Sequence, residues 1–93
     1  MRIIWQIAAR RKMAQILSYI SVESPAAAKK YTDEIFDRTN GILQFPEIGT
    51  IYSTSNHTVV RRIIIDKTKS ILYRVERDSV YILNVIDNRQ DWK

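Results

Sequence analysis

The 93-residue sequence has no cysteine, one histidine, two glycines and two prolines. Without cysteine the chain has no disulfides, no thiolate metal site and no cysteine nucleophile. The histidine, His57, has neither carboxylates at metal-binding spacing nor a nucleophile motif beside it, so we interpret it as a surface residue. Gly41 and Gly49 do not form a glycine-rich phosphate loop. The sequence therefore predicts no metal and no cofactor.

Long hydrophobic runs are also missing. No apolar run approaches the ~18 residues of a membrane span, and the apolar start of the chain is too short for a secretory signal. We therefore expect no membrane association and a cytoplasmic location. Hydrophobic residues make up 45% of the chain and charged residues 27%, which is typical of a globular protein. A chain of this length is expected to form one domain, residues 1–93, around a modest core.

The charge of the chain is positive and unevenly distributed. Fifteen basic residues against ten acidic ones give a formal net charge of +5. Residues 1–30 and 48–93 are basic, whereas residues 31–47 carry more acidic than basic side chains. The basic regions favour acidic partners, either nucleic acid or protein, without choosing between them.

Two helices are predicted in the first half of the chain. Apolar residues at helical spacing indicate one helix over about residues 7–21. Ser24 is a suitable N-cap for a second helix, and Pro25 suits its first position, where a missing N–H costs nothing. Phe45-Pro46 should end this helix. Because the link between the two helices is short, we expect them to pack as an antiparallel hairpin.

Strands are predicted on either side of these helices. Residues 2–5 indicate a short strand, and apolar runs near 58–65, 70–76 and 79–86 indicate three more. The turns between the last three are short, which requires antiparallel neighbours. Turn-forming and hydroxyl residues predict a loop over 44–56. The predicted fold is α+β with the order β-α-α-β-β-β, an antiparallel sheet with a helical hairpin packed on one face.

The candidate binding residues are basic or aromatic side chains in or near these strands. They are Arg61, Arg62, Tyr73, Arg74, Arg89, Trp92 and Lys93. Side chains alternate along a strand, so Arg61 and Arg62 should point to opposite faces of the sheet.

Each candidate also has a structural interpretation. Arg61 or Arg62 could protect a strand from edge-to-edge aggregation, and Tyr73 could belong to the core. Arg74 could pair with a carboxylate such as that of Glu76, and Arg89 could be neutralised by a neighbouring aspartate.

The chain resembles the RelE/ParE superfamily of bacterial toxins over nearly its whole length. The resemblance rests on four segments in order, Tyr19-Ile20, Ser24-Pro25-Ala26-Ala27, Pro46-Glu47-Ile48-Gly49 and Tyr73-Arg74-Val75. It implies the toxin of a type II toxin–antitoxin module, which inhibits growth and is neutralised in a hetero-oligomer with a cognate antitoxin. The antitoxin is expected to lay an acidic, amphipathic segment over the helical hairpin or a sheet edge.

The resemblance implies two possible mechanisms. RelE-like members cut mRNA on the ribosome without a metal, and in such a nuclease Arg61 and Arg89 would be catalytic. ParE-like members poison DNA gyrase instead. Ile63 and Ser70 occupy positions where the nucleases carry basic residues, and the tail lacks their tyrosine. We therefore favour the gyrase poison, with the ribosome-dependent nuclease and a non-toxic basic binding module as alternatives.

Overall fold

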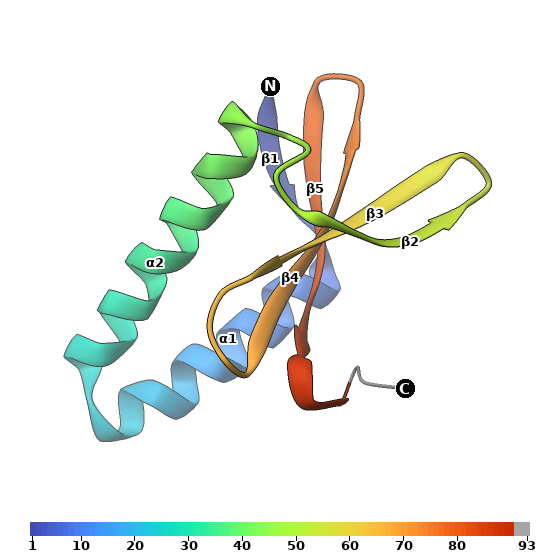
Figure 1. Cartoon of the computed structure of the whole chain (residues 1–93). Coiled ribbons are helices and arrows are strands. Elements are labelled where there is room, and N and C mark those ends of the chain that lie inside the picture. The colour runs from blue at the N-terminus through green and yellow to red at the C-terminus, as the bar shows by residue number, and fades with distance from the viewer. Residues whose placement is uncertain (91–93) are drawn as a thin grey trace.

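The structure is a computed structural model that describes residues 1–90. Two helices are followed by an antiparallel run of strands, and the first strand lies beside the last (Figure 1). In chain order the elements are β1 (Arg2–Trp5), α1 (Ile7–Glu23), α2 (Pro25–Gln44), β2 (Thr50–Ser55), β3 (Thr58–Ile64), β4 (Lys69–Glu76), β5 (Ser79–Asp87) and the short 3₁₀ helix η1 (Asn88–Gln90).

Ser24 both ends α1 and begins α2. Its backbone N–H donates to the carbonyl of Ile20, which closes the first helix, and its hydroxyl accepts from the N–H of Ala27 at 3.1 Å. Pro25 occupies the first turn of α2, as predicted. Because one residue serves as both caps, the helices reverse direction sharply and pack against each other as the predicted hairpin (Figure 1).

The sheet has five strands in the order β1-β5-β4-β3-β2. Strands β3, β4 and β5 pair antiparallel with their sequence neighbours, as predicted, and β2 adds an unpredicted antiparallel pair with β3. Strand β1 pairs parallel with β5, so the sheet is mixed. The expectation of a wholly antiparallel sheet was wrong at this pair. The helical hairpin separates β1 from the other strands, so no short turn fixes its direction.

Strand β2 lies within the segment that was predicted to be a loop. All six of its residues are exposed, and its one neighbour is β3. An edge strand that buries neither face needs no apolar alternation, so hydroxyl residues serve as well as apolar ones. The hydrogen-bonded pairing with β3 makes this segment a strand, whereas the residue pattern alone predicted a loop.

The core lies between the sheet and the helices. Strands β4 and β5 contribute Ile71, Tyr73, Val80, Ile82 and Val85, all almost fully buried. The helices contribute further side chains to the same cluster, namely Ala9, Ile35 and Ile42. One face of the sheet is therefore covered by the hairpin, and residues that point the other way lie on its uncovered side.

Candidate functional site

The pairing register places Arg61 and Arg62 on opposite faces of the sheet, as predicted. Arg61 is paired with Tyr73, and Arg62 with Leu72. Paired residues of antiparallel strands point to the same side. Tyr73 is fully buried in the core, so Arg61 lies on the helix side of the sheet and Arg62 on the side that the helices leave uncovered.

Arg61 fastens the loop between α2 and β2. Its Nη1 donates to the carbonyl oxygen of Gly49 at 2.8 Å and makes a longer contact, 3.4 Å, with that of Glu47. These carbonyls belong to the Pro46-Glu47-Ile48-Gly49 segment that carries part of the family resemblance. The side chain proposed as catalytic thus holds a loop in place.

Tyr73 fastens the same loop from the core. Its hydroxyl donates to the carbonyl oxygen of Pro46 at 2.8 Å and accepts from the N–H of Gly49 at 2.9 Å. Burial is the main cause that raises the pKa of this phenol. A β-carbon at Gly49 would lie 2.8 Å from the Tyr73 hydroxyl and from the carbonyl oxygen of Arg62, so glycine is the residue that fits here. The structure therefore places Tyr73 in the core.

Arg74 lies on the uncovered side with Arg62. Its guanidinium forms an ion pair with Glu76, as one interpretation of the sequence predicted, and its Cζ lies 4.3 Å from the centre of the Tyr81 ring. A cation over an aromatic face is attracted to it. The register also brings Leu72 and Asn84 to this side. We call the surface formed by the half-buried Arg62, Arg74, Tyr81 and Asn84 around the buried Leu72 the open face.

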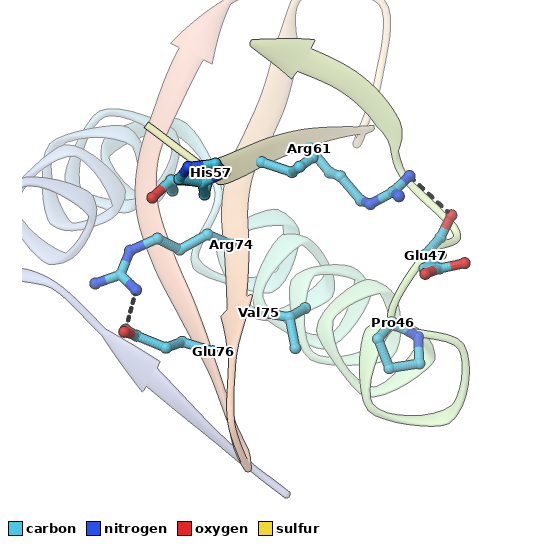
Figure 2. Close-up of a pocket in the computed structure, with 9 residues that line it drawn as sticks. Pro46, Glu47, His57, Arg61, Arg74, Val75 and Glu76 are labelled. Atoms are coloured by element: carbon cyan, nitrogen blue, oxygen red, sulfur yellow. Dashed lines mark hydrogen bonds and ion pairs between the residues drawn. The ribbon is translucent and has the colours of Figure 1, made fainter. Parts of the chain in front are cut away.

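A cavity of about 340 Å³ lies where β3 separates from β4. Arg61 and Arg74 both line it, but Figure 2 shows that they diverge, Arg61 toward the Glu47 loop and Arg74 toward Glu76. His57 lines the same cavity and is exposed, as predicted for a surface histidine. The two guanidinium groups therefore do not converge on a common point in this cavity.

Arg89 is held at the opposite end of the sheet. Its Nε and Nη2 donate to the carboxylate of Asp87 at 3.0 and 2.7 Å, and 69% of its side chain is exposed. The hydrogen bonds from Arg89 hold the pKa of Asp87 well below its usual range. Asp87 also lies 3.6 Å from the ammonium group of Lys69, its partner across the strands.

A polar cluster holds the end of β5 against the β3–β4 turn. The side chain of Asn88 accepts from the hydroxyl of Ser70 at 2.5 Å and donates to the carbonyls of Asp66 and Lys67. Burial alone would raise the pKa of Asp66, but hydrogen bonds from Thr68 and Lys69 outweigh it and lower that pKa. Ser70, aligned with a nuclease arginine, thus has a structural role.

Trp92 and Lys93, the remaining two candidates, lie outside the described residues. Within residues 1–90, no group of three or more histidine, aspartate or glutamate side chains could hold a metal ion. No helix in this part of the chain is long and apolar enough to cross a membrane.

The sequence analysis did not identify a groove between α1 and α2. The groove has a volume of about 440 Å³ and is lined by Trp5, Arg10, Met13, Ala14, Leu17, Thr32, Ile35 and Phe36. Phe36 is 56% exposed. It lies off the buried stripe of α2, which is formed by Ile35, Thr39 and Ile42. A large apolar side chain away from that stripe was the signal that could have revealed the groove. We call this surface the interhelical groove.

Comparisons with known proteins agree with the predicted fold and superfamily. The family model of the ParE toxin of the type II toxin–antitoxin system parDE matches residues 3–92. A solved chain of the chromosomal ParDE system from P. aeruginosa has a similar fold, with a TM-score of 0.73, 21% identity, and coverage of 94% of this chain and 95% of that chain. The comparison with curated proteins finds no match. The chain belongs to the family of ParE toxins of type II toxin–antitoxin systems.

Proposed function

We propose that this ParE toxin inhibits growth by binding DNA gyrase in the cytoplasm, without cutting RNA, and that a cognate antitoxin neutralises it in a hetero-oligomer. The toxin class follows from the family, and the choice of target is the proposal. One observation carries that choice, namely the placement of the two arginines that a nuclease would use.

Arg61 and Arg89 are separated and already engaged. Arg61 pairs across the sheet with Tyr73 of β4. Asp87, which binds Arg89, pairs with Lys69 of the same strand. Those partners are four residues apart, roughly 13 Å at the ~3.3 Å rise of a strand. Arg61 donates to loop carbonyls, and Arg89 to Asp87.

Metal-free phosphodiester cleavage needs charged and proton-transferring groups within hydrogen-bond reach of one phosphate. Two arginines at separate places, each with its own oxygen partners, do not supply such a site. This supports a binding mechanism over the nuclease.

The open face is the surface we assign to the target. Arg74 is oriented by Glu76 and the Tyr81 ring, so little side-chain entropy remains to be lost when it binds. Arg62 lies on the same side of the neighbouring strand. Arginines beside aromatic and apolar groups are frequent in protein interfaces, and the net charge of +5 favours an acidic surface on gyrase. Trp92 and Lys93 are proposed as further binding residues for the target.

The test is to express the toxin without its antitoxin in a bacterial host and to follow DNA and protein synthesis. We expect DNA synthesis to fall first, with gyrase–DNA cleavage complexes. The double variant Arg62→Glu/Arg74→Glu should lose this effect, whereas Lys30→Glu, an exposed charge reversal on α2, should retain it. Rapid cleavage of ribosome-bound mRNA would instead identify a nuclease, and unchanged growth would identify a non-toxic binding module.

The antitoxin is proposed to cover the helical hairpin. The interhelical groove is lined mainly by apolar side chains, and an amphipathic helix buries its apolar face in such a groove. Purified toxin and the antitoxin encoded in the same operon should form a stable complex, and failure of the wild-type proteins to associate would refute this partnership.

A further inference from the structure

We propose that Arg10 selects and positions the cognate antitoxin by pairing with an acidic side chain of an antitoxin helix seated in the interhelical groove. The inference rests on the proposed antitoxin partnership and adds to it the residue that decides specificity. Three features of the groove carry it: its apolar floor, the single charge in its lining, and a neighbouring arginine that points elsewhere.

The floor of the groove fits the apolar face of a helix. It is lined by the half-buried side chains of Trp5, Met13 and Leu17 and by the buried Ile35. Phe36 is exposed at its α2 side. Large apolar side chains left open to water in a concave surface favour association with a partner that covers them. An amphipathic helix, with apolar residues three or four positions apart, can pack its apolar face against this groove between two helices.

Arg10 is the one charged residue among the described residues that line this groove. Its side chain is exposed, and within residues 1–90 it makes no hydrogen bond or ion pair. A helix that covered the groove would remove water from this guanidinium. Burying an unpaired cation is strongly unfavourable, whereas burying it against a carboxylate can be favourable. The occupant must therefore bring an acidic side chain to this place.

This requirement makes Arg10 a specificity residue. Any helix with an apolar face could fill the floor of the groove, but one with a lysine or no charge opposite Arg10 would leave a desolvated, unpaired cation. Discrimination between partners often comes from such penalties against the wrong one. The apolar residues would supply affinity, and Arg10 would set which helix binds and in what register.

Arg11 provides a matched control. It is exposed, adjacent in the sequence and equal in charge, but it points about 100° further around α1 and does not line the groove. The variants Arg10→Glu and Arg11→Glu change the net charge of the toxin equally. Any difference between them therefore reports the local position of the charge and not the overall field.

The experiment measures the Kd of the purified antitoxin from the same operon for wild-type toxin and both variants at one salt concentration. We expect Arg10→Glu to weaken binding on the order of 100-fold and Arg11→Glu by less than about threefold. Equal weakening by both variants would overturn the inference, because net charge alone would explain it. No weakening by Arg10→Glu would overturn it as well. Thermal unfolding of each variant establishes that the fold is retained.

A second experiment uses charge-reversed antitoxins to test whether Arg10 pairs with one acidic residue. Each carries one acidic residue changed to lysine, and one of them should restore binding to Arg10→Glu while losing it to wild-type toxin. If none does so, Arg10 has no single acidic partner and the inference is refuted. The proposed partnership fails separately, because it requires only that the wild-type toxin and antitoxin associate.

Discussion

Replacing Tyr73 with phenylalanine removes one hydroxyl group and two hydrogen bonds that hold the loop after α2. The hydroxyl donates to the carbonyl of Pro46 and accepts from the N–H of Gly49. The aromatic ring would remain in its buried position, so packing of the core should change little. The variant therefore isolates the contribution of these hydrogen bonds to the free energy of unfolding.

The expected loss follows from the burial of the partners. Gly49 is buried, and its N–H would be left without a partner, which costs about 1–3 kcal/mol. Pro46 is half-buried, so its carbonyl can partly regain water and adds less. We expect a total of about 2–3 kcal/mol, which for a domain of this size lowers Tm by roughly 10–20 °C.

Thermal and urea unfolding of Tyr73→Phe measure this loss. Tyr19→Phe is the matched control, because Tyr19 is 78% exposed and its loss of a hydroxyl should leave Tm within about 2 °C. If the two variants unfold at the same temperature, the two hydrogen bonds do not stabilise the fold, and the structural role assigned to Tyr73 is refuted.

Three further predictions concern stability. Gly49→Ala should destabilise the fold by more than about 2 kcal/mol, because the added β-carbon would clash with backbone and side-chain atoms. Gly41→Ala in α2 should stabilise the fold by up to about 1 kcal/mol, because its β-carbon would have no atom within 4 Å. Thermal unfolding of the two variants tests both expectations. Within residues 1–90 the buried Tyr31 hydroxyl makes no hydrogen bond of standard geometry, and its pKa is raised to about 12, first by burial and then by the nearby carboxylate of Asp66. Thermal unfolding of Tyr31→Phe should therefore show a Tm within about 2 °C of wild type. Hydrogen bonds from Arg89 lower the pKa of Asp87, so the ionised carboxylate stabilises the fold above about pH 4 and this stabilisation is lost as the pH falls. In urea unfolding, the free energy of unfolding of Asp87→Asn should therefore fall less between neutral and acid pH than that of wild type. An equal fall would contradict this.

The helices were predictable because their signals are local. Ser24 and Pro25 mark a helix start whichever residues surround them, and the same serine ends the preceding helix. Strands β3, β4 and β5 were predictable for a related reason, since short turns connect them and two of the strands bury apolar residues.

The candidate site was less predictable, because a side chain's role depends on partners that are distant in the sequence. The residues could show that Arg61 and Arg62 point apart, but not that Arg61 would meet the carbonyl of Gly49, 12 residues earlier. Tyr73 likewise meets Pro46 across 27 residues. Residue type alone left both arginines and the tyrosine open to a structural or a binding role.

The sequence by itself determined the order of the two helices, the first strand and the last three strands, because periodicity is a property of neighbouring residues. It also determined the helix boundaries near Ser24, the excess of positive charge and the resemblance to the toxin superfamily, since capping and composition are local as well. Tertiary structure decided what required distant partners. It made residues 50–55 an edge strand, set β1 parallel to β5, turned Arg61 toward a loop and left Arg62 on the open face. Pairing register and helix packing fix these outcomes, and both depend on contacts between segments far apart in the chain.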